Sequence, residues 1–78
     1  MKINEVLKVM MKRAFVSQIL MASKLGLAQP NIASRLVRTN LMSDNILDML
    51  DVCGYEMVIR PKDTEEQYKS PWEMKVEK

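Results

Sequence analysis

The stretch VSQILMASKLGLAQPNIASRL, residues 16–36, predicts two short helices separated by a glycine. Ser17 is of a residue type that caps helix N-termini, and it is expected to begin a helix that ends just before Gly26. Glycine tolerates the positive φ that is common at helix ends. A second helix is expected from residue 29 to about residue 37, because Pro30 in its first turn sacrifices no helical hydrogen bond.

In helix-turn-helix proteins, a short turn of this kind joins two helices, and the second helix enters the major groove of DNA. Polar side chains remain at the start of this helix once its apolar positions are assigned to the core. Their types suit base recognition, since glutamine and asparagine pair with adenine and arginine pairs with guanine. Polar residues at the start of the helix before Gly26, and in the loop after the helix that begins at residue 29, are expected to contact phosphates. The candidates for base contact are Gln29, Asn31, Ser34 and Arg35, and those for backbone contact are Gln18, Arg38 and Asn40.

Three further elements are predicted around this stretch. Apolar residues spaced three and four apart predict an amphipathic helix over residues 3–14. After a loop at residues 38–43, a fourth helix is expected from a Ser43-Asp44 cap to about residue 52, with Gly54 at its end. Residues 55–60 alternate apolar and polar side chains, which is a strand pattern. In the helix over residues 3–14, the residues expected to face the core are Ile3, Val6, Leu7, Met10 and Ala14.

The remaining residues, 61–78, are polar and interrupted by proline, and they are expected to form a flexible tail. Alternating apolar side chains from Trp72 to Val76 leave open a short strand that pairs with residues 55–60. The chain is therefore divided into one domain, residues 1–60, and this tail.

Length and composition limit the possible classes of protein. A chain of 78 residues is one small domain, and 47% apolar with 28% charged residues is typical of a globular protein. No apolar run reaches the roughly 18 residues of a membrane helix, and the N-terminus lacks the features of a signal peptide. The single cysteine, Cys53, excludes an intrachain disulfide. A cytoplasmic location, away from membranes, is therefore expected.

Charge is divided unevenly along the chain. Residues 1–43 contain seven cations and one anion, a net charge of +6, whereas residues 44–78 contain five cations and nine anions, a net charge of −4. The first half therefore suits a polyanion such as DNA, which the second half repels.

Residue types used in catalysis and metal binding are scarce. Histidine, the commonest general base and metal ligand, is absent. Cys53 is interpreted as a small buried hydrophobe rather than a nucleophile. Asp44, Asp48 and Asp51 match no metal-loop spacing and are interpreted as a solvated helix face. The chain is therefore not expected to be an enzyme or to need a metal or other cofactor.

Residues 16–36 together with NLMSDNILDMLDVCGYEMVI, residues 40–59, resemble the lambda-repressor-like, Cro-type (XRE) helix-turn-helix family. The shared features are a Ser-Gln helix start, a Leu-Gly turn, a further helix and an ending similar to LGYE before an apolar strand. The resemblance covers about residues 3–60. It implies an all-α domain of four to five helices with a short C-terminal β-strand, acting as a dimeric transcriptional regulator such as a repressor. By position it assigns phosphate contact to Gln18 and groove contact to Gln29, Asn31 and Ser34.

The strand at residues 55–60 needs a partner for its backbone amides. A second copy of the chain, in a homodimer, is the expected partner, and the chain's own tail is the alternative. The function expected from these observations is sequence-specific binding of double-stranded DNA.

A protein-interaction module is the alternative function. Ile19 and Leu20 stand where the family typically exposes Glu or Lys, which leaves an apolar surface, and the tail offers Tyr68 and Trp72. An antitoxin-like or inhibitor protein would keep the helical fold and use these residues to hold a protein partner.

Overall fold

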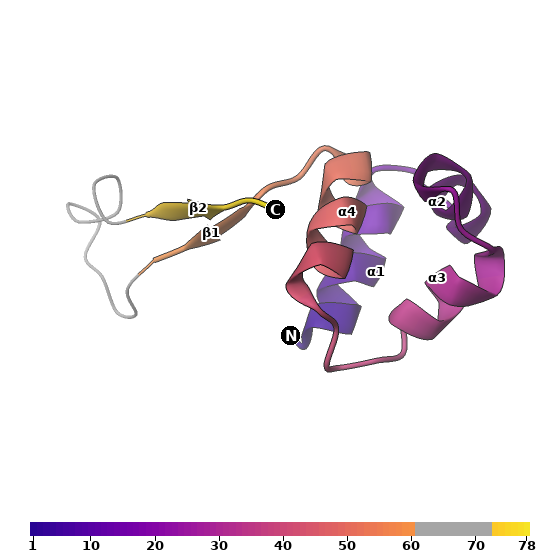
Figure 1. The fold of residues 1–78 in the computed structure, drawn as a ribbon, viewed down its shortest axis with the longest axis horizontal. Coiled ribbons are helices and arrows are strands. Elements are labelled where there is room, and N and C mark those ends of the chain that lie inside the picture. The colour runs from indigo at the N-terminus through magenta and orange to yellow at the C-terminus, as the bar shows by residue number, and fades with distance from the viewer. Residues whose placement is uncertain (61–72) are drawn as a thin grey trace.

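The computed structural model describes residues 1–60 and 73–78, which form four α-helices and a two-stranded antiparallel sheet (Figure 1). The helices gather in one body, and the strand pair extends from it. None of the helices in these two segments combines the length and apolar composition needed to cross a membrane. The elements are α1 (Ile3–Arg13), α2 (Gln18–Leu25), α3 (Gln29–Arg35), α4 (Ser43–Cys53), β1 (Met57–Ile59) and β2 (Met74–Val76). The expected small and mostly helical domain is confirmed.

The core is built mainly from leucine, isoleucine and methionine. Each helix contributes one side chain that is fully buried: Leu7 from α1, Met21 from α2, Ile32 from α3 and Met49 from α4. α4 packs against both α1 and α2, and α2 also packs against α3. Methionine has an unbranched, flexible side chain that fills irregular gaps, so it suits the places where short helices meet at different angles.

The buried face of α1 differs from the expected one. Leu7, Met10 and Met11 are buried, whereas Val6 is 36% exposed. Met11 lies four residues after Leu7, so the two side chains follow one another along a single stripe of the helix. The buried face of α1 is therefore rotated around the helix from the expected one, away from Val6 and toward Met11.

Capping residues mark the start of α2 and the ends of α2 and α4. Ser17 Oγ accepts a hydrogen bond of 3.0 Å from a backbone amide in the first turn of α2, which confirms it as the N-cap. At α4 the cap lies one residue earlier than expected, because Met42 is the N-cap and Ser43 is the first helical residue. Met42 offers no side-chain capping bond. α2 and α4 end at Gly26 and Gly54, whose φ angles are 68° and 79°.

The segment expected to be a flexible tail contains a strand. β2 pairs antiparallel with β1, with Met57 opposite Val76 and Ile59 opposite Met74. The alternative pairing with the chain's own tail is therefore present, and the expectation of a tail without regular structure is wrong at residues 74–76. Tyr68 and Trp72 lie outside the described residues.

One face of the strand pair is apolar along its length. Residues opposite one another share a face, so Met57 and Val76 lie on the same side as Ile59 and Met74. The first pair packs against the helical core, whereas Ile59 and Met74 are 53% and 63% exposed. The apolar face thus continues beyond the part that the helices cover.

Candidate nucleic-acid interface

Local hydrogen bonds around Gly26 build the turn between α2 and α3. The Gly26 N–H donates to the Ser23 carbonyl at 3.3 Å, and the Leu27 N–H donates to the Ala22 carbonyl at 2.9 Å. This arrangement requires the left-handed backbone at Gly26, which a residue with a side chain rarely adopts. The turn brings α3 back against α2. The two helices and the turn between them agree with the prediction from the sequence.

The first turn of α3 exposes two amide side chains. Ile32 is completely buried, and it fixes the inward face of the helix. Gln29 and Asn31 are exposed. Both side chains therefore meet solvent at the end of α3 that follows the turn.

The remaining polar candidates lie on α2, on α3 and in the loop that follows it. Ser34 is half-buried on α3, and Gln18 is half-buried in the first turn of α2. Arg38 and Asn40 are exposed after α3 ends. Both loop residues are thus accessible to a ligand that lies along α3.

Arg35 does not belong to the exposed face of α3. Its side chain is only 9% exposed, and Nη1 has no hydrogen-bond partner among the described residues. Arg35 follows Ile32 by three residues and precedes Leu36, and both neighbours are buried. The 3.6-residue period of the helix therefore turns Arg35 inward. The expectation that Arg35 contacts guanine is corrected, because its guanidinium group is withdrawn from the surface.

A side chain that the sequence did not single out ties α1 to the end of α3. Asn4 Nδ2 donates a hydrogen bond of 3.3 Å to the carbonyl of Leu36, which is the C-cap residue of α3. This bond satisfies a carbonyl that has no partner within its helix. Asn4 and Leu36 are 32 residues apart, so no local pattern signals the contact.

Surface charge follows the division seen in the sequence. Glu5 is the single acidic residue among residues 1–43. α4 instead exposes Asp44 and Asp51. The exposed cations among residues 1–43 are Lys2, Lys8, Lys12, Arg13, Lys24 and Arg38. Four of these cations lie on α1 or next to it, Lys24 lies on α2 and Arg38 follows α3, so residues 1–43 form the half of the chain suited to an anionic ligand.

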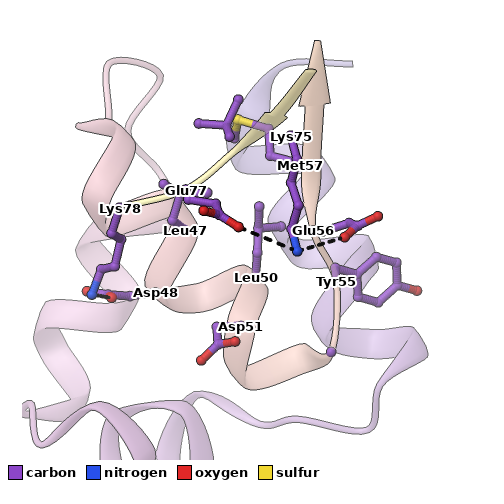
Figure 2. A pocket seen from close by; sticks show the side chains of 12 residues that line it. Leu47, Asp48, Leu50, Asp51, Tyr55, Glu56, Met57, Lys75, Glu77 and Lys78 are labelled. Carbon is purple, nitrogen blue, oxygen red and sulfur yellow. Dashed lines mark ion pairs between the residues drawn. The ribbon is translucent and has the colours of Figure 1, made fainter. Parts of the chain in front are cut away.

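A groove of about 800 Å³ opens between α4 and the strand pair (Figure 2). Lys75 lies 3.4 Å from Glu56 and 3.7 Å from Glu77, measured from Nζ to the carboxylate oxygens. Lys78 pairs with Asp48 of α4, and the hydrogen bond that its ammonium donates raises the pKa of Lys78. Both lysines of the groove are thus already paired with carboxylates, and the groove does not favour a phosphate.

Cys53 is half-buried at the end of α4. Burial raises the pKa of its thiol, which favours the neutral form. A neutral thiol packed among apolar side chains agrees with the interpretation of Cys53 as a small hydrophobe.

The most exposed aromatic side chain among the described residues is Phe15, between α1 and α2. It is 91% exposed, and its φ of 57° lies in the left-handed region. Ile19 and Leu20, which the sequence indicated as an apolar surface, are 67% and 40% exposed. The residue type of Phe15 gives no signal of this left-handed backbone, because glycine is the residue that usually adopts it.

No family model, curated protein or solved structure matches the chain.

Proposed function

We propose that this protein is a sequence-specific, DNA-binding transcriptional regulator of the lambda-repressor-like, Cro type, and that α3 enters the major groove. The observation that carries the proposal is the exposure of Gln29 and Asn31 on a helix held by the turn at Gly26 and by buried Ile32. In helix-turn-helix proteins this first turn faces the base edges. Amide side chains at that position pair with adenine through N6 and N7.

Contacts with the phosphate backbone of DNA are assigned to polar residues around α3. Gln18 begins α2, and Arg38 and Asn40 follow α3 in the loop. The exposed cations of residues 1–43 add positive charge that supports binding to DNA. The affinity is expected to fall as salt rises, with a log–log slope of about −0.9 for each phosphate neutralised.

The proposed regulator acts as a homodimer through its strand pair. A two-stranded sheet is marginally stable by itself, and Ile59 and Met74 remain exposed at its outer part. A second copy related by a two-fold axis covers these side chains. Figure 1 shows the strand pair and α3 at opposite ends of the molecule, so this contact leaves both copies of α3 free.

The proposal is tested by selecting bound oligonucleotides from a random pool, with the mass of the protein in solution measured alongside. The expected consensus is a palindrome rich in A·T pairs, with half-sites separated by one helical turn of DNA or a multiple of it. A selection that enriches no sequence would contradict the proposal.

One variant and a control test the proposed contact to phosphate. Gln18→Ala is expected to weaken binding to all sequences alike, because a phosphate contact carries no sequence information. Ser43→Ala, an exposed change on α4, is the control and is expected to leave binding unchanged.

A further inference from the structure

Phe15 holds a backbone conformation that its residue type disfavours. The Val16 N–H donates to the Met11 carbonyl at 2.9 Å, and the Phe15 N–H donates to the Lys12 carbonyl at 3.3 Å. This is the hydrogen-bond pattern of a helix end that turns through a left-handed residue. α2 and α4 end in the same pattern, and both use glycine at that position. Phenylalanine thus stands where glycine is favoured, with a φ of 57°.

The fold gains no packing in return for this strain. The Phe15 side chain is 91% exposed, so it contributes almost nothing to the core. Ile19 and Leu20, on the first turn of α2, are also exposed. These three exposed apolar residues, Phe15, Ile19 and Leu20, lie within six positions of the chain at the start of α2 and are together called the corner patch. An exposed apolar patch held at a cost to the folded chain indicates a surface that is covered in a complex.

Cations adjoin the corner patch. Lys12 and Arg13 immediately precede the turn, and Lys24 lies one helical turn after Leu20; all three are exposed. The nearest acidic residue in this half, Glu5, is ten positions before Phe15 in the sequence and lies in the first turn of α1. The charges that flank the corner patch in the sequence are therefore positive, which favours a partner that carries carboxylates around its apolar side chains.

We propose that the corner patch binds a partner protein through an acidic segment with apolar anchor residues, and that Phe15 inserts between those anchors. An aromatic side chain held by a hydrogen-bonded turn is preorganised for a pocket, and buried aromatic residues commonly dominate the energy of an interface. An anionic membrane is the weaker fit. Helices that lie on membranes present a long apolar face, whereas the apolar face of α1 is buried in the core through Leu7, Met10 and Met11.

The test is a selection of random peptides displayed on phage against the immobilised protein, followed by affinity measurements on the enriched peptides. The expected peptides combine Asp or Glu with aromatic or aliphatic residues, and their affinity falls as salt rises. Phe15→Gly and Phe15→Ala are each expected to weaken binding by roughly tenfold or more. Phe15→Gly relieves the strained backbone and Phe15→Ala keeps a side chain there, so a loss in both variants points to the aromatic ring.

Met42→Ser is the matched control, because Met42 is 71% exposed and precedes α4. It is expected to leave peptide binding unchanged. The proposal is overturned if the enriched peptides carry no excess of carboxylates, or if both Phe15 variants bind them as the parent protein does. It is also overturned if the ring of Phe15 is needed instead for binding to anionic phosphatidylserine vesicles or for self-association of the chain.

Discussion

Phe15 is the residue at which local preference and structure disagree most. Its left-handed backbone costs a residue with a side chain about 1 kcal/mol, and glycine removes that cost. We therefore predict that Phe15→Gly stabilises the folded protein by about 1 kcal/mol, measured by urea denaturation. Phe15→Ala is the control: it deletes the ring but keeps the strained backbone, so its stability should be close to that of the parent. A loss of stability in both variants would show that the ring packs against the fold.

Arg35 is the second residue whose surroundings oppose its chemistry. The side chain is 91% removed from solvent, and its buried Nη1 has no hydrogen-bond partner in the described part of the chain. Arg35→Met keeps a long side chain and removes the buried charge, so we predict a gain of about 1 kcal/mol in the free energy of unfolding. DNA affinity is expected to stay unchanged.

Arg38→Met is the comparison for Arg35, because Arg38 is exposed. It is expected to leave stability unchanged and to weaken binding to every DNA sequence. If Arg35→Met weakened DNA binding as strongly as Arg38→Met, Arg35 would contact DNA. That result would contradict the assignment of Arg35 to the protein interior.

Some of these residue positions were predictable and others were not. Gly26 and Gly54 mark helix ends because glycine itself signals a left-handed backbone. Phe15 carries no such signal. The sequence favours an exposed Arg35 because charged side chains are rarely buried, although Arg35 lies within about 60° of inward Ile32 on the helix. For Arg35, the position around the helix decided burial, and the charged residue type did not.

At the scale of the elements, α2 and α3 differ in how they begin. Ser17 caps α2 with a hydrogen bond of 3.0 Å, whereas Ala28 provides no side-chain cap for α3. Ala28→Ser is predicted to stabilise the fold by about 1 kcal/mol, and Ser17→Ala to destabilise it by about the same amount. Thermal unfolding of both variants checks this. A lower unfolding temperature for Ala28→Ser would mean that α3 begins elsewhere.

The order of the four helices and the position of β1 could be predicted because each depends on local periodicity and capping. Local sequence alone did not favour a strand at β2 as clearly. Its three residues, Met74–Val76, form a strand through pairing with β1, which is distant in the sequence. The exposure of Asn31 was predictable because it lies about 100° around the helix from buried Ile32. The exposure of Gln29, three residues before Ile32, and the contact between Asn4 and Leu36 were not predictable in this way.

At the scale of the whole molecule, the strand pair is the proposed dimer contact. Ile59→Lys places a charge on its apolar face and is predicted to shift the protein to a monomer at concentrations where the parent is dimeric. Sedimentation equilibrium measures this shift. Val58→Lys, on the opposite face of β1, is the control and should leave the dimer intact. Equal effects of both changes would place the contact at the strand edge instead of this face.

DNA recognition by α3 is tested most directly by the ratio of affinities for the selected site and for a scrambled sequence. For a variant carrying both Gln29→Ala and Asn31→Ala, we predict that affinity for the selected site falls by about 1–3 kcal/mol per lost base contact. Affinity for the scrambled sequence should change little, so the ratio collapses. An unchanged ratio in a correctly folded double variant would contradict the assignment of α3 to the major groove.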